Sequence, residues 1–178
     1  MVDRWTWALR GVAALLVGVT AFAWPSAALE DLVRLMGVYA AGVGGVGLVG
    51  AARASFEGHP APRAWLALCV LDLGFGVAVF VWPGASALAL LWPVGPAVWA
   101  LGEGVALLLA ARHVRADAAS QRLLRVLGGL AIVFCVGVAV PWLPGTTAIV
   151  WLVGGYFVVI GVLALLVARV FGASRPSG

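Results

Sequence analysis

Two carboxylates interrupt otherwise apolar segments of this sequence and are its clearest candidates for chemistry. Asp72 stands within "LCVLDLGFGVAVFVWPG", residues 68–84, and Glu103 stands within "LGEGV", residues 101–105. A charged side chain at the centre of a membrane helix costs about 2.5–3.5 kcal/mol on insertion scales, and a protonated acid lowers that cost. Two neighbouring carboxyl groups can also share a proton. The sequence therefore predicts either a proton or cation site, or a neutral acid pair that joins helices, which is the simpler interpretation.

Other arrangements of reactive residues are poorly represented. His59 and His113 stand far apart, without the spacing of a metal site, and we interpret Cys69 and Cys135 as small apolar residues within helices. The serines have no partner base for nucleophilic catalysis. The arginines occur in ones and twos rather than in a basic stripe with aromatic residues, which argues against nucleic acid as a partner. We expect no enzyme activity, no metal and no cofactor.

The elements that hold the two carboxylates are expected to lie in a membrane. Of the 178 residues, 64% are hydrophobic and 10% are charged, and the mean hydropathy is +1.12, whereas a soluble domain has about 25% charged residues. Continuous apolar runs of about 20 residues are typical of transmembrane helices. The sequence predicts an all-α integral membrane protein with six such helices, near residues 7–24, 28–52, 64–82, 86–111, 123–143 and 146–168.

The six runs form three repeats of a helical hairpin, with a period of about 60 residues. Each repeat has a glycine seven residues before a proline at the hairpin turn, and each second helix carries an aromatic residue, a glycine and an arginine in that order. The turn prolines are Pro25, Pro83 and Pro144, with Pro141 as an alternative in the third repeat. The hairpins cover about residues 5–53, 64–112 and 123–169 of one membrane domain, followed by a short tail, residues 170–178.

The first helix could be a signal peptide, because arginines precede its apolar run and "AFA" at residues 21–23 resembles a cleavage site. It matches the first helix of the other two repeats, however. We therefore interpret it as part of the mature protein.

The arginines predict the orientation of the helices. Ten of the eleven fall on one side of the predicted bundle, and the exception is Arg34. The excess of positive charge in cytoplasmic loops places both termini in the cytoplasm and the proline turns outside. The expected cytoplasmic anchors at the helix ends are Arg53, Arg63, Arg112 and Arg169.

The same anchors place the two carboxylates at one depth. Asp72 is nine residues from Arg63, and Glu103 is nine residues from Arg112. At a helical rise of about 1.5 Å per residue, both carboxylates are expected about 13 Å from the cytoplasmic anchors. The two carboxylates can form a pair only if they also lie on the same face of the bundle.

Glycines recur in the second predicted helix, "MGVYAAGVGGVGLVGAA". Small residues on one face let membrane helices approach closely. Such a face serves either as a hinge or subunit interface, or as an intrachain contact with the first or third helix, which is the simpler interpretation. The glycines expected at helix contacts are Gly37, Gly44, Gly45, Gly47, Gly50, Gly104 and Gly161.

With the hairpin motifs "FAWPSAAL", "FVWPGASAL" and "LPGTTAI", the chain resembles the HdeD-type acid-resistance membrane proteins over about residues 5–170. The resemblance implies a six-helix protein of the bacterial inner membrane, built from repeats of a domain of unknown function and associated with survival of acid stress. It also implies an acid just before the glycine of a second helix. Glu103 fits that place, which Gly44 and Ile160 occupy in the other repeats.

We therefore expect a non-enzymatic membrane protein linked to acid or stress tolerance through proton handling or membrane integrity. The alternative is an accessory structural subunit packed into a larger membrane complex, such as an energy-transducing assembly. The expected partners are the lipid bilayer and either further copies of the chain or that larger complex. Co-purification at fixed stoichiometry in mild detergent distinguishes the two functions.

Overall fold

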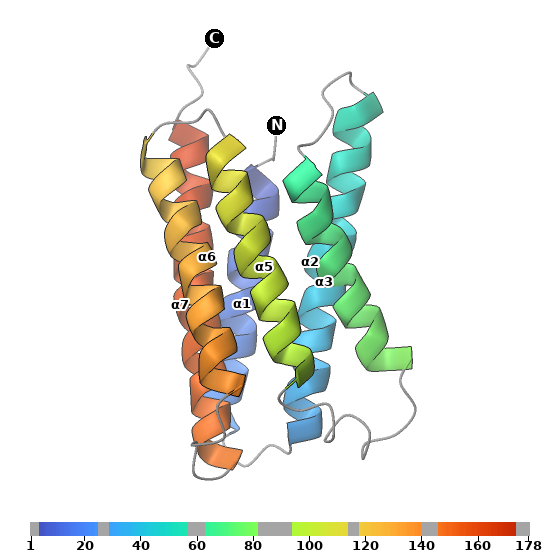
Figure 1. Cartoon of the computed structure of the whole chain (residues 1–178), viewed down its shortest axis with the longest axis vertical. Helices are drawn as coiled ribbons and strands as arrows, with labels where there is room; N and C mark the ends of the chain where they lie inside the picture. The colour runs from blue at the N-terminus through green and yellow to red at the C-terminus, as the bar shows by residue number, and fades with distance from the viewer. Residues whose placement is uncertain are drawn as a thin grey trace.

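The described part of the chain is entirely helical. The computed structural model describes residues 4–24, 29–56, 63–81, 94–113, 118–139 and 146–173, and within these ranges it contains six α-helices and no strand (Figure 1). The helices are α1 (Arg4–Ala23), α2 (Leu29–Phe56), α3 (Arg63–Val81), α5 (Val94–His113), α6 (Ala118–Ala139) and α7 (Thr146–Ala173).

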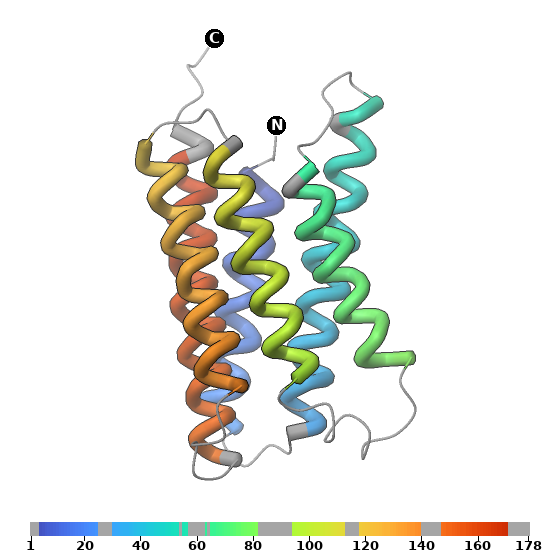
Figure 2. Tube along the Cα trace, in the orientation of Figure 1, coloured from blue at the N-terminus to red at the C-terminus, as the bar shows by residue number. Residues whose placement is uncertain are grey.

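The six described helices form a closed ring. Each helix runs antiparallel to the next, so that α1 begins and α7 ends at the same end of the bundle (Figure 2). Around the ring, α1 contacts α2, α2 contacts α3, α3 contacts α5, α5 contacts α6, and α6 contacts α7, which returns to α1. The most extensive contacts join α1 to α7, α2 to α3 and α5 to α6. The helices of one hairpin therefore pack less extensively on each other than on the helices of neighbouring hairpins.

Glycines explain why two of these contacts, α1 to α7 and α5 to α6, are so close. A Cβ atom added to Gly11 of α1 would lie 2.9 Å from the carbonyl oxygen of Gly161 of α7, and the reverse distance is also 2.9 Å. The same reciprocal arrangement joins Gly104 of α5 to Gly128 of α6, at 2.8 Å in both directions. Real Cβ atoms do not approach backbone oxygens so closely, so only glycine allows the backbones to touch here.

Five of the six described helices are long and apolar enough to cross a membrane. The sixth, α3, has a shorter apolar stretch, Trp65–Val81, and a crossing needs about 20 residues. Its expected span ended at residue 82, which lies outside the described residues, as do the first eight residues of the fourth expected span. The turn prolines Pro25, Pro83 and Pro144, the alternative Pro141, and His59 also lie outside them.

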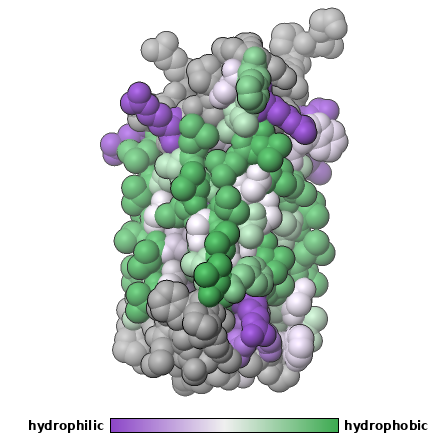
Figure 3. Space-filling model, turned by 90° about the vertical axis from the view of Figure 1, so that its right-hand side faces the viewer, coloured by the Kyte–Doolittle hydropathy of each residue, from purple (hydrophilic) through white to green (hydrophobic). Residues whose placement is uncertain are grey.

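The surface of the bundle suits an apolar environment. The face in Figure 3 is apolar along its middle and carries hydrophilic residues towards its ends. Large apolar side chains, most of them valines, are exposed on each of the six described helices. The predicted anchors Arg53, Arg63, Arg112 and Arg169 are exposed at helix ends on one side of the bundle. At the opposite end, Arg34 forms an ion pair with Glu30 one turn earlier in α2.

Candidate functional site

A buried ion cluster joins three helices near the axis of the bundle. The guanidinium of Arg10, on α1, donates from Nη1 to Oδ2 of Asp72 on α3 at 3.0 Å. Its Nη2 donates to Oε1 of Glu103 on α5. The three side chains are almost inaccessible, with exposed fractions of 2%, 0% and 2%. One arginine therefore binds both of the carboxylates that the sequence singled out.

Two aromatic side chains bind the remaining carboxylate oxygens. The indole Nε1 of Trp99, on α5, donates to Oδ1 of Asp72 at 2.9 Å. The hydroxyl of Tyr156, on α7, donates to Oε2 of Glu103 at 3.5 Å. Each of the four oxygens thus has a donor, which is what burial of charged oxygens requires. The cluster ties α1, α3, α5 and α7 together.

The cluster has unequal charge when all its members are ionised. One guanidinium faces two carboxylates, which leaves one net negative charge. Burying an uncompensated charge costs several kcal/mol, so a proton or another cation is needed to balance the site. Among the described residues, no group of three or more His, Cys, Asp or Glu side chains is arranged to hold a metal ion.

Stacked aromatic rings pack beside the buried cluster. Trp99 stacks on Phe75 with ring centroids 5.1 Å apart, and Phe157 lies nearly parallel to Trp99 at 6.3 Å. Tyr156 stacks on Phe134 at 4.0 Å. Tyr39 meets Phe157 edge to face at 5.0 Å. The electrostatic interactions of the cluster therefore act in a dry environment, where they are stronger than in water.

The repeat architecture explains how the polar residues meet. Three aromatic residues about 60 positions apart occupy corresponding places on the second helix of each repeat, and all three are buried: Tyr39, Trp99 and Tyr156. At the place in the first repeat that corresponds to Asp72 stands the fully buried Ala14. At the place in the second repeat that corresponds to Arg10 stands the buried Leu68. The charged cluster thus occupies positions that are apolar in a neighbouring repeat.

The structure brings Asp72 and Glu103 together through Arg10, which was not among the residues expected at the site. Asp72 and Glu103 lie on facing helices, and both bind Arg10. Arg10 was counted among the N-terminal arginines that signal topology, yet it is buried within α1. Its position six residues inside α1 was the available signal, because an arginine that deep in a span needs a partner.

The predicted packing glycines fall into two groups. Gly44 and Gly47 of α2 approach Cys69 of α3, Gly37 approaches Val79, and Gly104 and Gly161 make the reciprocal contacts described above. Gly45 differs, because a Cβ atom added there would meet nothing within 4 Å, and at Gly50 it would meet only Thr6 at 4.0 Å. The close face of α2 is therefore the one that carries Gly37, Gly44 and Gly47.

Comparison with known families identifies the repeat. Residues 9–68 and 67–140 each match a short repeat of unknown function, DUF308. The two matches begin about 60 residues apart, in accord with the internal period. No curated protein was found to match this chain, and no solved structure was found to match it.

Proposed function

Since this chain belongs to the DUF308 family of short repeats of unknown function, we propose that its function resides in the buried ion cluster of the helix bundle. It acts as a non-enzymatic multi-pass protein of the bacterial inner membrane, similar to the HdeD-type proteins. It contributes to acid or stress tolerance by binding and releasing one proton. The cluster atom that exchanges the proton is Oε2 of Glu103.

The hydrogen-bond inventory is the observation that carries this assignment. Both oxygens of Asp72 face groups that can only donate, the Arg10 guanidinium and the Trp99 indole. A proton on Asp72 would therefore have no acceptor. Oε2 of Glu103 instead faces the Tyr156 hydroxyl, which can donate or accept by rotating. Glu103 can thus be held in either protonation state, while Asp72 stays ionised.

Charge balance supports the same assignment. With Glu103 protonated, Arg10 and Asp72 form a neutral pair in a dry site. When Glu103 loses its proton, the cluster gains one net negative charge and the Tyr156 hydroxyl turns to donate to it. The protonated state is the one that burial favours, because an isolated charge in a medium of low dielectric constant is costly. Release of the proton therefore requires that water or another acceptor reach the cluster.

Single amide substitutions test the assignment. Glu103→Gln keeps the shape of the side chain, and its amide N–H can donate a hydrogen bond to the Tyr156 hydroxyl. We therefore expect wild-type stability. Asp72→Asn turns an amide N–H towards either Arg10 or Trp99, two donors, and also removes the anion that balances Arg10. We expect this variant to lose stability by about 1–3 kcal/mol through the unmatched donors. Melting temperatures in detergent measure both effects.

Infrared difference spectroscopy and acid survival then test the proton. The wild-type protein should show the carbonyl band of a buried protonated carboxyl that disappears as the pH rises, and Glu103→Gln should lack it. Cells or proteoliposomes with Glu103→Gln should lose acid protection or proton movement although the protein is folded. Glu30→Gln is the matched control, because Glu30 pairs with Arg34 at the end of α2.

Three results would count against the proposal. A carboxyl band that survives Glu103→Gln and is lost in Asp72→Asn would assign the proton to Asp72 instead of Glu103. Full activity of both amide variants would reduce the cluster to a structural joint between helices. Co-purification of the native protein at fixed stoichiometry with a larger membrane complex, together with unchanged acid survival, would favour the accessory-subunit function.

A further inference from the structure

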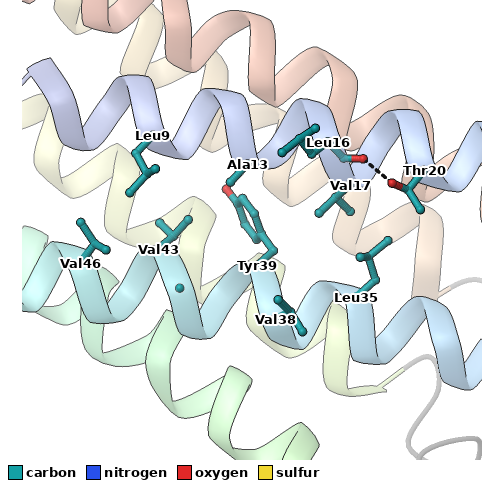
Figure 4. Close-up of a pocket in the computed structure, with 11 residues that line it drawn as sticks. Leu9, Ala13, Leu16, Val17, Thr20, Leu35, Val38, Tyr39, Val43 and Val46 are labelled. Carbon is teal, nitrogen blue, oxygen red and sulfur yellow. Dashed lines mark hydrogen bonds between the residues drawn. The ribbon is translucent and has the colours of Figure 1, made fainter.

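An apolar groove opens between α1 and α2, the two helices of the first hairpin. It encloses about 310 Å³, a volume at the lower end of the range of about 300–1,000 Å³ for small-molecule sites. Leu9, Leu16 and Val17 line it from α1, and Leu35 and Val46 line it from α2 (Figure 4). The groove lies where α1 and α2 pack less extensively on each other than on α7 and α3.

One polar group in this groove lacks a partner. The ring of Tyr39 crosses the groove from α2, and its hydroxyl points towards α1 beside Ala13 (Figure 4). The side chain is 96% buried, since its exposed fraction is 4%. Within the described ranges, its hydroxyl is the one buried side-chain polar atom without a hydrogen bond of good geometry, and the neighbouring Arg10 can only donate to it. The other hydroxyl of the groove, that of Thr20, donates to the carbonyl of Leu16 at 2.8 Å.

Neither lipid tails nor the described residues supply this hydroxyl with an acceptor. A buried donor without an acceptor is destabilising, and phenylalanine at position 39 would fill the same space without that penalty. The acyl chains of lipids carry no acceptor. Tyr39 is nine residues from Glu30, so it lies about 14 Å inside the end of the helix, away from the interface in which headgroups lie.

We propose that the α1–α2 groove binds an uncharged, lipid-soluble molecule that has an apolar body and a carbonyl oxygen, and that Tyr39 donates a hydrogen bond to this oxygen. The apolar lining accommodates the body of the molecule. The depth of Tyr39 selects against a charged headgroup, because a charge in the hydrocarbon region is costly. A protonated fatty acid and an alkyl quinone share this chemistry and enter laterally from the bilayer.

The site adjoins the ion cluster. The Tyr39 hydroxyl lies within hydrogen-bonding reach of Arg10, and the Tyr39 ring contacts Trp99 edge to face with centroids 6.4 Å apart. Trp99 in turn holds Asp72. A ligand carbonyl bound by Tyr39 would therefore lie beside the ion cluster.

Glycines on α2 provide matched variants for the test. A Cβ atom added to Gly42, which lines the groove, would meet nothing within 4 Å, and the same holds for Gly45 one turn later, which does not line it. Gly42→Leu therefore fills the groove without forcing the helices apart. Gly45→Leu is its control. Tyr39→Phe removes only the hydroxyl and should fold at least as stably as the wild type, since it deletes an unmatched donor.

The experiment measures melting temperature in mild detergent against the concentration of three probes. Decanoic acid at acidic pH and a decyl-substituted benzoquinone carry carbonyl oxygens, and decane does not. Wild-type protein and Gly45→Leu should bind at least one carbonyl probe about tenfold more tightly than decane. Tyr39→Phe should remove this preference, and Gly42→Leu should abolish binding. A response to one carbonyl probe but not the other identifies the source of the ligand.

Several results overturn the inference. Equal binding of decane and the carbonyl probes, or an unchanged preference in Tyr39→Phe, would leave the groove as a place for lipid tails. Binding that Gly42→Leu does not affect would place the probes elsewhere. If Gly42→Leu instead changes only the oligomeric state, the groove is a contact with a second copy. Because none of these measurements involves Glu103, failure here leaves the proton proposal untouched, and the converse also holds.

Discussion

At the scale of single residues, the cluster depends on the difference between groups that can only donate a hydrogen bond and groups that can either donate or accept one. Trp99 and Tyr156 occupy corresponding positions in the second and third repeats, and each binds one carboxylate. An indole fixes its carboxylate as an acceptor, whereas a phenol allows its carboxyl group to exchange a proton. In the function we propose, the two aromatic residues thus give the two acids different chemistry.

Removal of Arg10 should be far more damaging than removal of an exposed arginine on the same helix. Arg10→Leu leaves Asp72 buried without its counterion, and breaking a buried ion pair costs about 3–5 kcal/mol. Arg4→Leu, at the exposed start of α1, should cost less than about 0.5 kcal/mol. The melting temperatures of the two variants in detergent test this difference in stability. Equal stability of Arg10→Leu and the wild type would mean that the cluster does not form in the folded protein.

At the scale of helices, the glycine contacts decide which helices pair. The backbones of α1 and α7, of α2 and α3, and of α5 and α6 touch through glycine or through glycine and a small residue. In a membrane, such contacts rely on dispersion and backbone proximity, since lipid tails are as apolar as leucine. The three contacts lie at equivalent places around the ring. They join neighbouring repeats through more extensive contacts than those between the two helices of one hairpin.

Two adjacent glycines on α2 should respond oppositely to alanine. A Cβ atom on Gly44 would lie 2.5 Å from the backbone nitrogen of Leu73 and 2.7 Å from the carbonyl oxygen of Cys69. Backbone atoms cannot yield as a side chain does, so Gly44→Ala should lose about 1–3 kcal/mol. Gly45→Ala meets nothing within 4 Å and should gain up to about 1 kcal/mol, because alanine is the better helix former.

Reversible unfolding in mixed micelles gives both free energies of unfolding. If Gly44→Ala is as stable as Gly45→Ala, then α2 and α3 do not approach as closely as described, and the glycine-rich face of α2 contacts lipid.

At the scale of the whole molecule, the exposed arginines give the bundle a charged end. Arg53, Arg63, Arg112 and Arg169 all lie at helix ends on the same side. The positive-inside rule predicts that this end faces the cytoplasm. Reporter fusions after Gly58 and Gln121 should therefore read as cytoplasmic, and a fusion after Gly145 should read as external. A periplasmic signal at Gly58 would reverse the orientation.

The sequence predicted the helices well because each needs only a continuous apolar run, which composition and length reveal. It also predicted that Asp72 and Glu103 lie at one depth, since depth follows from counting residues to the arginines at the helix ends. It could not predict their counterion. Counting arginines for topology treats Arg10 like Arg4, although only a three-dimensional arrangement shows that α1 reaches both acids.

The order of the ring was also beyond the sequence. A hairpin motif suggests that its two helices are each other's main partners, whereas α1 packs chiefly on α7, at the far end of the chain. Helical periodicity shows which face is small or apolar but not which neighbour covers it. The pair Gly11 and Gly161 is recognisable only once α1 and α7 are known to be adjacent.

The closure of the ring through α1 and α7 has a consequence for biogenesis. During synthesis α1 is made before the other five described helices, yet its main partner, α7, is made after all of them. The guanidinium of Arg10 precedes Asp72 and Glu103 along the chain, so it has neither counterion when it leaves the ribosome. Its long side chain can meanwhile reach the nearby interface, as arginines near helix ends do. The contact between α1 and α7 thus forms only once α7 has been made and docks against α1.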